Sequence, residues 1–168
     1  MAEQKTDGID TNPITVALQR VYLKDSSFEA PNSPAIFQGE WRPNVALNLG
    51  VATNELGNDT YEVVLSLSAE AKQGDKTAFL IEIQQAGVFL IQGLEPADLQ
   101  RALMTFCPQQ LYPFGREAIA DLSGKGGFPA LQLQPVNFDA IASEAVRRAQ
   151  ADKAAQPEQP NPAPESSQ

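Results

Sequence analysis

Histidine is absent from this 168-residue chain, and cysteine occurs only once, as Cys107. A nucleophilic serine or cysteine would therefore lack its usual base, and a single thiol can form neither an internal disulfide nor the common structural zinc sites. Segment 123–127 has the glycines of a phosphate loop without its spacing, and no acidic cluster has the spacing of a metal site. We expect no enzyme activity, no cofactor and no metal, and a buried, inert Cys107.

Basic residues and long apolar runs are also scarce. The 21 Asp and Glu residues outnumber the 12 Lys and Arg residues, which gives a net charge of −9. Nucleic acids and anionic membranes repel such a chain, so a basic protein is the expected partner. No apolar run approaches the roughly 20 residues that span a bilayer, and the first residues lack the pattern of a signal peptide. These features predict a cytoplasmic protein that does not insert into the membrane.

Composition divides the chain into three parts. Residues 1–12 are polar and are expected to be a flexible segment, whereas residues 150–168 are rich in proline and have almost no large apolar side chain. A segment of the second kind cannot bury enough surface to offset its conformational entropy, which predicts a disordered tail. Residues 13–149 hold most of the apolar content and have the length of one ordinary domain.

The first half of the chain alternates apolar and polar residues with a period of two, which predicts strands. The first strand shifts phase near Gln19, which indicates a bulge. No helix long enough for a crossover separates the strands, so the sheet should be antiparallel. Residues 72–75 suit a hairpin turn, whereas the proline-rich segment 31–43 is too long for one and must cross the sheet. The expected strands lie within residues 14–23, 45–51, 61–71 and 77–83.

The second half of the chain changes to helical periodicity. One helix is predicted over residues 96–107, beginning at Pro96 and ending before Pro108, and a second over residues 111–122. Asn137 can cap a last helix with an apolar stripe. Strands followed by helices predict an α+β domain. The stripe of the last helix consists of Ile141, Ala142, Ala145, Val146 and Ala149.

Some apolar side chains of the predicted sheet point away from its helices. Either another subunit or a bound ligand would cover these side chains, or they pack in an ordinary core. They are Val64, Ala78, Leu80, Val88 and Leu90, together with Phe37 and Trp41 on the crossing segment.

Five segments carry a family resemblance: Val21–Asn32, Tyr61–Leu65, Thr77–Leu80, Tyr112–Glu117 and Phe128–Asp139. In these segments, which occur in order between about Ile14 and Arg148, the chain closely resembles the SecB family of protein-export chaperones of Gram-negative bacteria. The resemblance implies a four-stranded antiparallel sheet with helices packed on one face, assembled as a homotetramer that is a dimer of dimers. It also implies an ATP-independent cytosolic holdase that binds unfolded precursor proteins, keeps them translocation-competent and delivers them to the SecA motor at the translocon.

The resemblance further implies two binding surfaces. In the family the outer sheet surface docks SecA through positions that correspond here to Asp25, Glu29, Leu80 and Glu82. Period-two geometry agrees with this, because Leu80 and Glu82 share one face of their strand and Asp25 and Glu29 are an even number of residues apart. The partner segment of SecA is a basic, zinc-bearing C-terminal tail, which a net charge of −9 would attract.

The second implied surface is a client groove beneath the crossing segment. The same positions would also suit a core or a subunit interface, and the sequence leaves that choice open. Burial of apolar client surface provides affinity without directional contacts, so many client sequences can be accepted. By position, the groove residues are Phe37, Trp41, Val45, Leu47, Leu49 and Leu133.

Two functions from other classes remain as alternatives. A scaffold protein would use the acidic sheet to bind folded partners only, and a small-molecule carrier would hold one stoichiometric ligand in the groove. Capture of an unfolded chain distinguishes both from a holdase.

Overall fold

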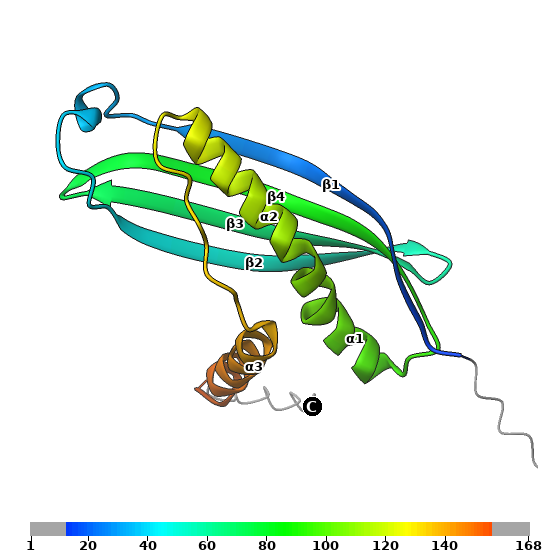
Figure 1. Ribbon diagram of the computed structural model, residues 1–168. Coiled ribbons are helices and arrows are strands. Elements are labelled where there is room, and N and C mark those ends of the chain that lie inside the picture. Colours follow the sequence, from blue (N-terminus) through cyan, green and yellow to red (C-terminus); the bar gives the residue numbers. More distant parts are fainter. Residues whose placement is uncertain (1–12, 156–168) are drawn as a thin grey trace, which may run out of the picture. The chain divides into compact units, whose positions relative to one another are not determined.

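The structure, a computed structural model, describes residues 13–155, which divide into two compact units between Val136 and Asn137. The first unit contains a sheet and two helices (Figure 1), and the second is one helix, α3 (Phe138–Ala155). The elements of the first unit are β1 (Thr15–Glu29), the 3-10 turn η1 (Ala35–Phe37), β2 (Asn44–Gly57), β3 (Thr60–Gln73), β4 (Lys76–Gln92), α1 (Pro96–Met104) and α2 (Phe106–Lys125). This confirms the predicted α+β class with four strands in succession.

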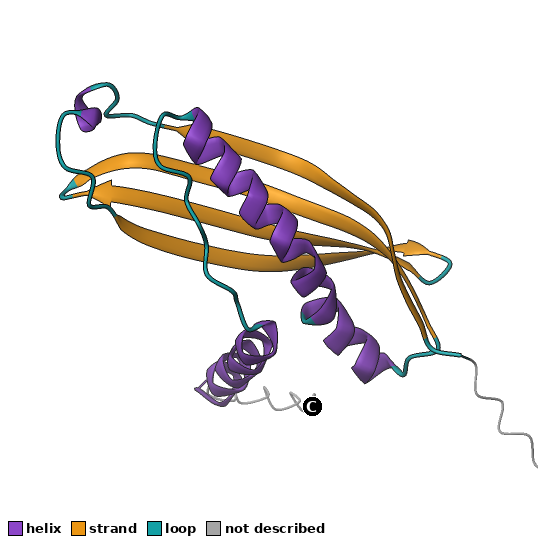
Figure 2. Cartoon of the chain, viewed as in Figure 1, coloured by secondary structure: helices purple, strands orange, loops and turns teal. Residues whose placement is uncertain are grey.

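The four strands form one antiparallel sheet in the order β1-β4-β3-β2 (Figure 2). β3 and β4 are the central strands, joined by the predicted hairpin turn in which Gly74 has φ +60°, a conformation that favours glycine. β1 and β2 lie at opposite edges, so the segment between them passes from one edge to the other. We call residues 30–43 the crossover loop, and its course confirms that this segment is no hairpin.

Strand β1 contains two register shifts against β4. The first lies between Leu18 and Arg20, which confirms the bulge expected from the change of phase at Gln19. The second lies between Leu23 and Asp25 and leaves Lys24 without a paired residue on β4. Each bulge absorbs one extra residue, so the strand regains its alternation on the far side.

The core lies between the sheet and α2, which crosses β3 and β4 (Figure 1). Gly115 allows this approach, because a Cβ atom there would lie 2.8 Å from Cδ1 of Leu67. Each large apolar side chain removed from water contributes about 1.5–3 kcal/mol to folding. The largest fully buried side chains of the two central strands are Val63, Leu65, Leu67, Phe79, Ile81, Ile83 and Phe89.

The helix boundaries differ from those expected. We predicted helices over 96–107 and 111–122, but α1 ends at Met104 and α2 runs from Phe106 to Lys125. Pro108 does not end a helix as predicted: it lies in the first turn of α2, where a backbone N–H has no intrahelical partner to lose. Thr105 separates the two helices with a non-helical φ of −123°.

Helix α3 begins as predicted, because Oδ1 of Asn137 accepts a hydrogen bond of 3.0 Å from the backbone N–H of Ala140. It continues to Ala155, beyond residue 150 at which the disordered tail was expected to begin. The expected flexible segment 1–12 and the rest of the tail, residues 156–168, lie outside the described residues. Within residues 13–155, no helix has the length and apolar content needed to cross a membrane.

Candidate docking face and apolar groove

The face of the sheet opposite α2, which we call the outer face, gathers the four residues expected to bind SecA. Asp25 pairs with Gln84 and Glu29 with Leu80, so both acids share a face with the even-numbered residues of β4. From Phe79 onward the odd-numbered residues of that strand point the other way, since Ile83 lies beneath Gly115 of α2. Asp25, Glu29, Leu80 and Glu82 therefore lie together on two adjacent strands.

The bulge at Lys24 is needed for this arrangement. Tyr22 pairs with Ala86 and Asp25 with Gln84, so Tyr22 and Asp25 share the outer face although they are three positions apart. In an uninterrupted strand an odd separation would put them on opposite faces. The extra residue thus brings the acids of β1 to the same side as Tyr22.

The acids of the outer face fall into two groups. Asp25, Glu29 and Glu82, which we call the acidic patch, are exposed, and none of them has a salt bridge to any of the described residues. Glu70, by contrast, lies 3.2 Å from Nζ of Lys72 and accepts a hydrogen bond of 3.0 Å from Oγ1 of Thr77. The acids expected to contact a basic partner are therefore carboxylates that have no counter-ion among the described residues.

Glu62 is the second paired acid, at the other end of this face. Its Oε1 atom lies 2.7 Å from Nζ of Lys24 and also accepts a hydrogen bond from the hydroxyl of Tyr22. These two donors hold the pKa of the Glu62 carboxyl below its usual range, with the Lys24 hydrogen bond as the larger cause. The hydrogen bond between Tyr22 and Glu62 raises the pKa of Tyr22, because loss of the phenolic proton beside a carboxylate is unfavourable.

Leu80 is an apolar side chain that lies between two acidic residues of the outer face. It pairs with Glu29 on β1 and with Glu70 on β3, and it is half-buried. A partner that fits this face would therefore combine positive charge with some apolar surface.

An aromatic cluster occupies the other side of the sheet, at the end near the crossover loop. Its members are Phe28 of β1, Phe79 of β4, Phe128 after α2, and Phe37 and Trp41 of the loop. Phe128 is central, with ring centroids 5.0 Å from Phe37, 5.3 Å from Trp41 and 5.0 Å from Phe79. Trp41 also stacks on Phe79 with an interplanar angle of 25°. Aromatic rings at these distances are in contact with one another and together form an apolar surface.

The segment after α2 fits closely against this cluster. A Cβ atom at Gly126 would lie 2.1 Å from Cζ of Phe28, and Gly127 has φ +84°. Both positions therefore favour glycine, for steric reasons at the first and conformational reasons at the second. Gly126 and Gly127 of the glycine-rich segment 123–127 are thus packed against aromatic rings.

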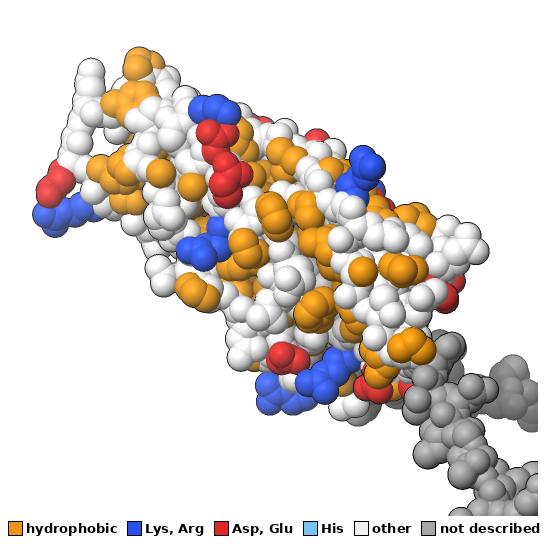
Figure 3. All heavy atoms as spheres, turned by 45° about the vertical axis from the view of Figure 1, so that its right-hand side comes forward, with side chains coloured by type: hydrophobic (Ala, Val, Ile, Leu, Met, Phe, Trp, Pro, Cys, Tyr) orange, Lys and Arg blue, Asp and Glu red, His pale blue; other side chains and the backbone are white. Residues whose placement is uncertain are grey.

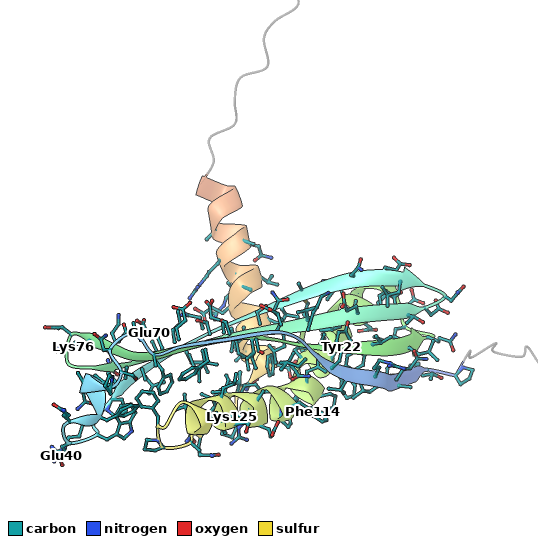
Figure 4. All side chains as sticks on the ribbon, turned by 90° about the horizontal axis from the view of Figure 1, so that it is seen from above. Tyr22, Glu40, Glu70, Lys76, Phe114 and Lys125 are labelled. Carbon is teal, nitrogen blue, oxygen red and sulfur yellow. The ribbon has the colours of Figure 1, made fainter. Side chains whose placement is uncertain are left out.

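Side-chain hydrogen bonds hold the crossover loop against the end of the sheet that carries the β3–β4 turn. Glu40 of the loop and Lys76 next to that turn lie at this same end in Figure 4. Oε1 of Gln73 accepts a hydrogen bond of 3.0 Å from the backbone N–H of Arg42, and its Nε2 donates to the carbonyl of Glu40. Nδ2 of Asn32 donates to the carbonyl of Thr77 at 2.8 Å. A cavity of about 230 Å³ lined by Asn32, Gln73 and Lys76, among others, remains beneath the loop.

The predicted groove residues differ in accessibility. Phe37 is 48 % exposed and Val45 is 37 % exposed, whereas Trp41 is half-buried. Leu47 and Leu49 are also half-buried and share a face of the edge strand β2 with Val45, because their partners Ala71, Ala69 and Leu67 all belong to the helix-covered side. Leu133 is only 5 % exposed and contributes to the core rather than to an open surface.

Sequence reasoning missed three members of the aromatic cluster: Phe28, Phe79 and Phe128. Phe79 follows the period-two pattern of β4, and that pattern predicts its face but not the rings that it meets. Phe28 and Phe128 belong to segments that carry the family resemblance, yet only the fold brings them together at a centroid distance of 6.4 Å.

The remaining candidate chemistry is limited. Cys107 is fully buried, as expected, and burial raises the pKa of its thiol to about 12, so its nucleophilic thiolate is scarce at neutral pH. Among the described residues, no group of three or more His, Cys, Asp or Glu side chains could hold a metal ion.

Comparison with known proteins identifies the family. The family described as "Preprotein translocase subunit SecB" matches residues 10–149. "Protein-export protein SecB" of Hahella chejuensis is 57 % identical over 143 residues, which cover 85 % of this chain and 90 % of that protein. The protein of the same name from Marinobacter nauticus is 49 % identical over 152 residues, covering 90 % of this chain and 92 % of that protein.

A solved structure supports the fold. The chain is similar to the SecB-like chaperone of Mycobacterium tuberculosis in complex with a peptide from an antitoxin, with a TM-score of 0.61 and 20 % identity. The match covers 73 % of this chain and 91 % of that chain. The match along most of the sequence, together with this fold, shows that the chain belongs to the SecB family of protein-export chaperones.

Proposed function

We propose that this chain is an ATP-independent cytosolic holdase that binds unfolded precursor proteins, keeps them translocation-competent and delivers them to SecA. One observation carries the proposal: an acidic patch, which has no counter-ion within residues 13–155, and an aromatic cluster lie on opposite sides of the same strands. A chaperone that must hold one protein while it contacts another needs two surfaces of different chemistry. Family membership agrees with this division.

Client binding is assigned to the aromatic cluster and the neighbouring face of β2. Apolar contact contributes about 25 cal/mol per Å² of buried surface and requires no particular hydrogen-bond partner. Phe37 and Val45 are exposed at this end, and Trp41 extends the surface toward Phe79. The cavity beneath the loop, at about 230 Å³, is smaller than typical small-molecule sites of about 300–1,000 Å³, which weighs against a carrier function.

SecA docking is assigned to Asp25, Glu29, Leu80 and Glu82 on the outer face. The basic, zinc-bearing C-terminal tail of SecA supplies the charge that this patch lacks. Opposite charges accelerate encounter and make binding sensitive to salt, while Leu80 adds an apolar contact. Docking on the outer face leaves the aromatic cluster accessible to the client.

Assembly as a homotetramer, a dimer of dimers, belongs to the same proposal. β1 is an edge strand of 15 residues, and a long unpaired edge invites pairing with another chain. Exposed apolar side chains recur over the face shown in Figure 3, and a second subunit would cover such residues. Those on β1 and α2 are Val16, Leu18, Leu23, Phe106 and Phe114.

The test is dilution of a chemically denatured, slow-folding precursor into buffer with and without this protein. Light scattering and size-exclusion chromatography should show suppressed aggregation and a complex eluting with a tetramer, without nucleotide. If the precursor aggregates or refolds at its unaided rate, the holdase function is wrong. Binding of folded partners alone would then indicate a scaffold.

A further inference from the structure

The bulge residue of β1, Lys24, interacts with a strand that is not its neighbour. Because Lys24 has no paired residue on β4, its side chain does not have to follow the strict alternation of faces that strand pairing imposes. It crosses β4 and places Nζ 2.7 Å from Oε1 of Glu62 on β3. β1 and β3 are separated by β4 throughout the sheet, so this ion pair spans three strands.

The residue beneath the pair leaves room for it. Ala86 of β4 is fully buried although it lies on the outer face, and Tyr22 is its paired residue on β1. The hydroxyl of Tyr22 donates to the same carboxylate oxygen of Glu62 that Lys24 contacts. The carbonyl of Tyr22 in turn accepts a hydrogen bond of 2.9 Å from Nε2 of the buried Gln85, which fixes the strand beside the bulge.

We propose that Lys24 is a specificity-determining residue of the outer face: by pairing with Glu62 it confines a cationic partner to the acidic patch of Asp25, Glu29 and Glu82. This inference rests on the proposed docking of the basic SecA tail. Without Lys24, Glu62 would be a fourth unpaired carboxylate on the same face. The positive charge of the partner would then have two competing positions.

The solvent exposure of Lys24 and Glu62 indicates that their ion pair influences partner binding as well as folding. The side chain of Lys24 is 43 % exposed and that of Glu62 only 12 % exposed. A partner approaching the face therefore meets the ammonium group more readily than the carboxylate. Lys24 also precedes Asp25 of the acidic patch directly in the sequence, so the ion pair and the patch are carried by the same stretch of β1.

The experiment measures affinity for a zinc-loaded synthetic peptide of the SecA C-terminal tail by isothermal titration calorimetry at low salt. Lys24→Met should tighten binding roughly threefold by freeing Glu62, and Glu62→Gln should weaken it by roughly the same factor by freeing Lys24. The double variant Lys24→Met/Glu62→Gln should return close to wild type. Lys125→Met is the matched control, because it frees Asp121 on α2 and changes the net charge equally.

A second measurement tests where on the outer face the peptide binds. Glu82→Lys should reduce affinity strongly in the wild-type background and less in the Lys24→Met background, where Glu62 offers an alternative contact. A role for Lys24 in folding alone would lower affinity in both single variants and would not change the effect of Glu82→Lys.

The inference is overturned if Lys24→Met and Lys125→Met tighten binding equally, or if both single variants weaken it while the wild type binds. If the wild type does not bind the peptide, or binds it with an affinity that Leu80→Arg leaves unchanged, SecA docking on this face is wrong as well. The two failures are therefore distinguishable.

Discussion

The outer face and the aromatic cluster share strands β1 and β4 but differ in how their side chains are held. The carboxylates of the acidic patch project from paired strands into solvent, without counter-ions among the described residues. The rings of the cluster come from β1, β4, the crossover loop and the segment after α2, and they pack on one another. The first surface suits one charged partner, and the second suits many apolar ones. The predictions for Gly126, for Glu82 and Leu80, and for salt test whether these two surfaces are independent, and the last prediction tests the ion pair at the edge of the first surface.

The largest effect is expected from Gly126→Ala, which changes the cluster alone. The new methyl group would overlap the ring of Phe28, which is held between Phe79 and Phe128, so the cluster must shift. Overpacking of this kind costs about 1–3 kcal/mol. Urea denaturation at fixed protein concentration should show the loss, together with weaker client capture and unchanged affinity for the SecA tail.

The control for that variant is Gly124→Ala. Nothing lies within 4 Å of a Cβ atom at this helical position. Replacing a helical glycine with alanine should therefore stabilise the protein by roughly 0.5–1 kcal/mol. Equal effects of the two substitutions would show that the contact with Phe28 has no energetic importance.

The next effect is expected from Glu82→Lys or Leu80→Arg on the outer face. Both introduce positive charge where a cationic tail is proposed to bind, so affinity for the SecA tail should fall at least about tenfold, or 1.4 kcal/mol. Client capture and the proposed tetrameric assembly should be unaffected. Glu55→Lys makes the same change of charge as Glu82→Lys, but near the β2–β3 turn, and serves as the control for that variant. Loss of client capture in a tetrameric variant would contradict the division between the two surfaces.

Salt should affect binding at the two surfaces differently, with a smaller effect than the substitutions. Raising the ionic strength from about 0.05 M to about 0.5 M shortens the Debye length roughly threefold and should weaken binding of the SecA tail severalfold. Client capture by the aromatic cluster should be unchanged or slightly stronger. Both are measurable by fluorescence anisotropy with labelled ligands, and parallel weakening of both would indicate one shared site.

The smallest effect concerns the pH dependence of stability. The folded protein holds the pKa of Glu62 below its unfolded value, so its contribution is present above the unfolded pKa and is lost as pH falls through the folded pKa. Because Lys24 is partly exposed, the contribution should be only a few tenths of a kcal/mol. Urea midpoints of Glu62→Gln and wild type should differ at pH 7 and converge in acid. A constant difference across this range would exclude the ion pair as its cause.

Periodicity predicted the strands well where apolar residues mark the phase. The bulge at Gln19 was visible because Leu18 and Val21 are apolar and out of step. The bulge at Lys24 was not, since the residues from Lys24 to Ser27 are all polar and show no change of phase. The position of Asp25 on the outer face was nevertheless expected correctly, because it followed from family resemblance.

Contacts between distant segments could not be predicted in the same way. The pairing of Lys24 with Glu62 requires the strand order, which places β4 between them and a small residue beneath. The extension of α2 through Pro108 depended on which turn of the helix that proline occupies. Local patterns specify faces and breaks, whereas partners across the sheet are specified by topology.

The burial of the single thiol has a practical consequence for labelling. Cys107 has no solvent exposure and its thiol has a pKa of about 12, so maleimide reagents should react with it slowly at neutral pH. A cysteine introduced at the exposed Ser27, which pairs with Glu82 on the outer face, would then be the reactive one. Site-specific fluorophores for following SecA encounter can therefore be attached without first removing the native cysteine.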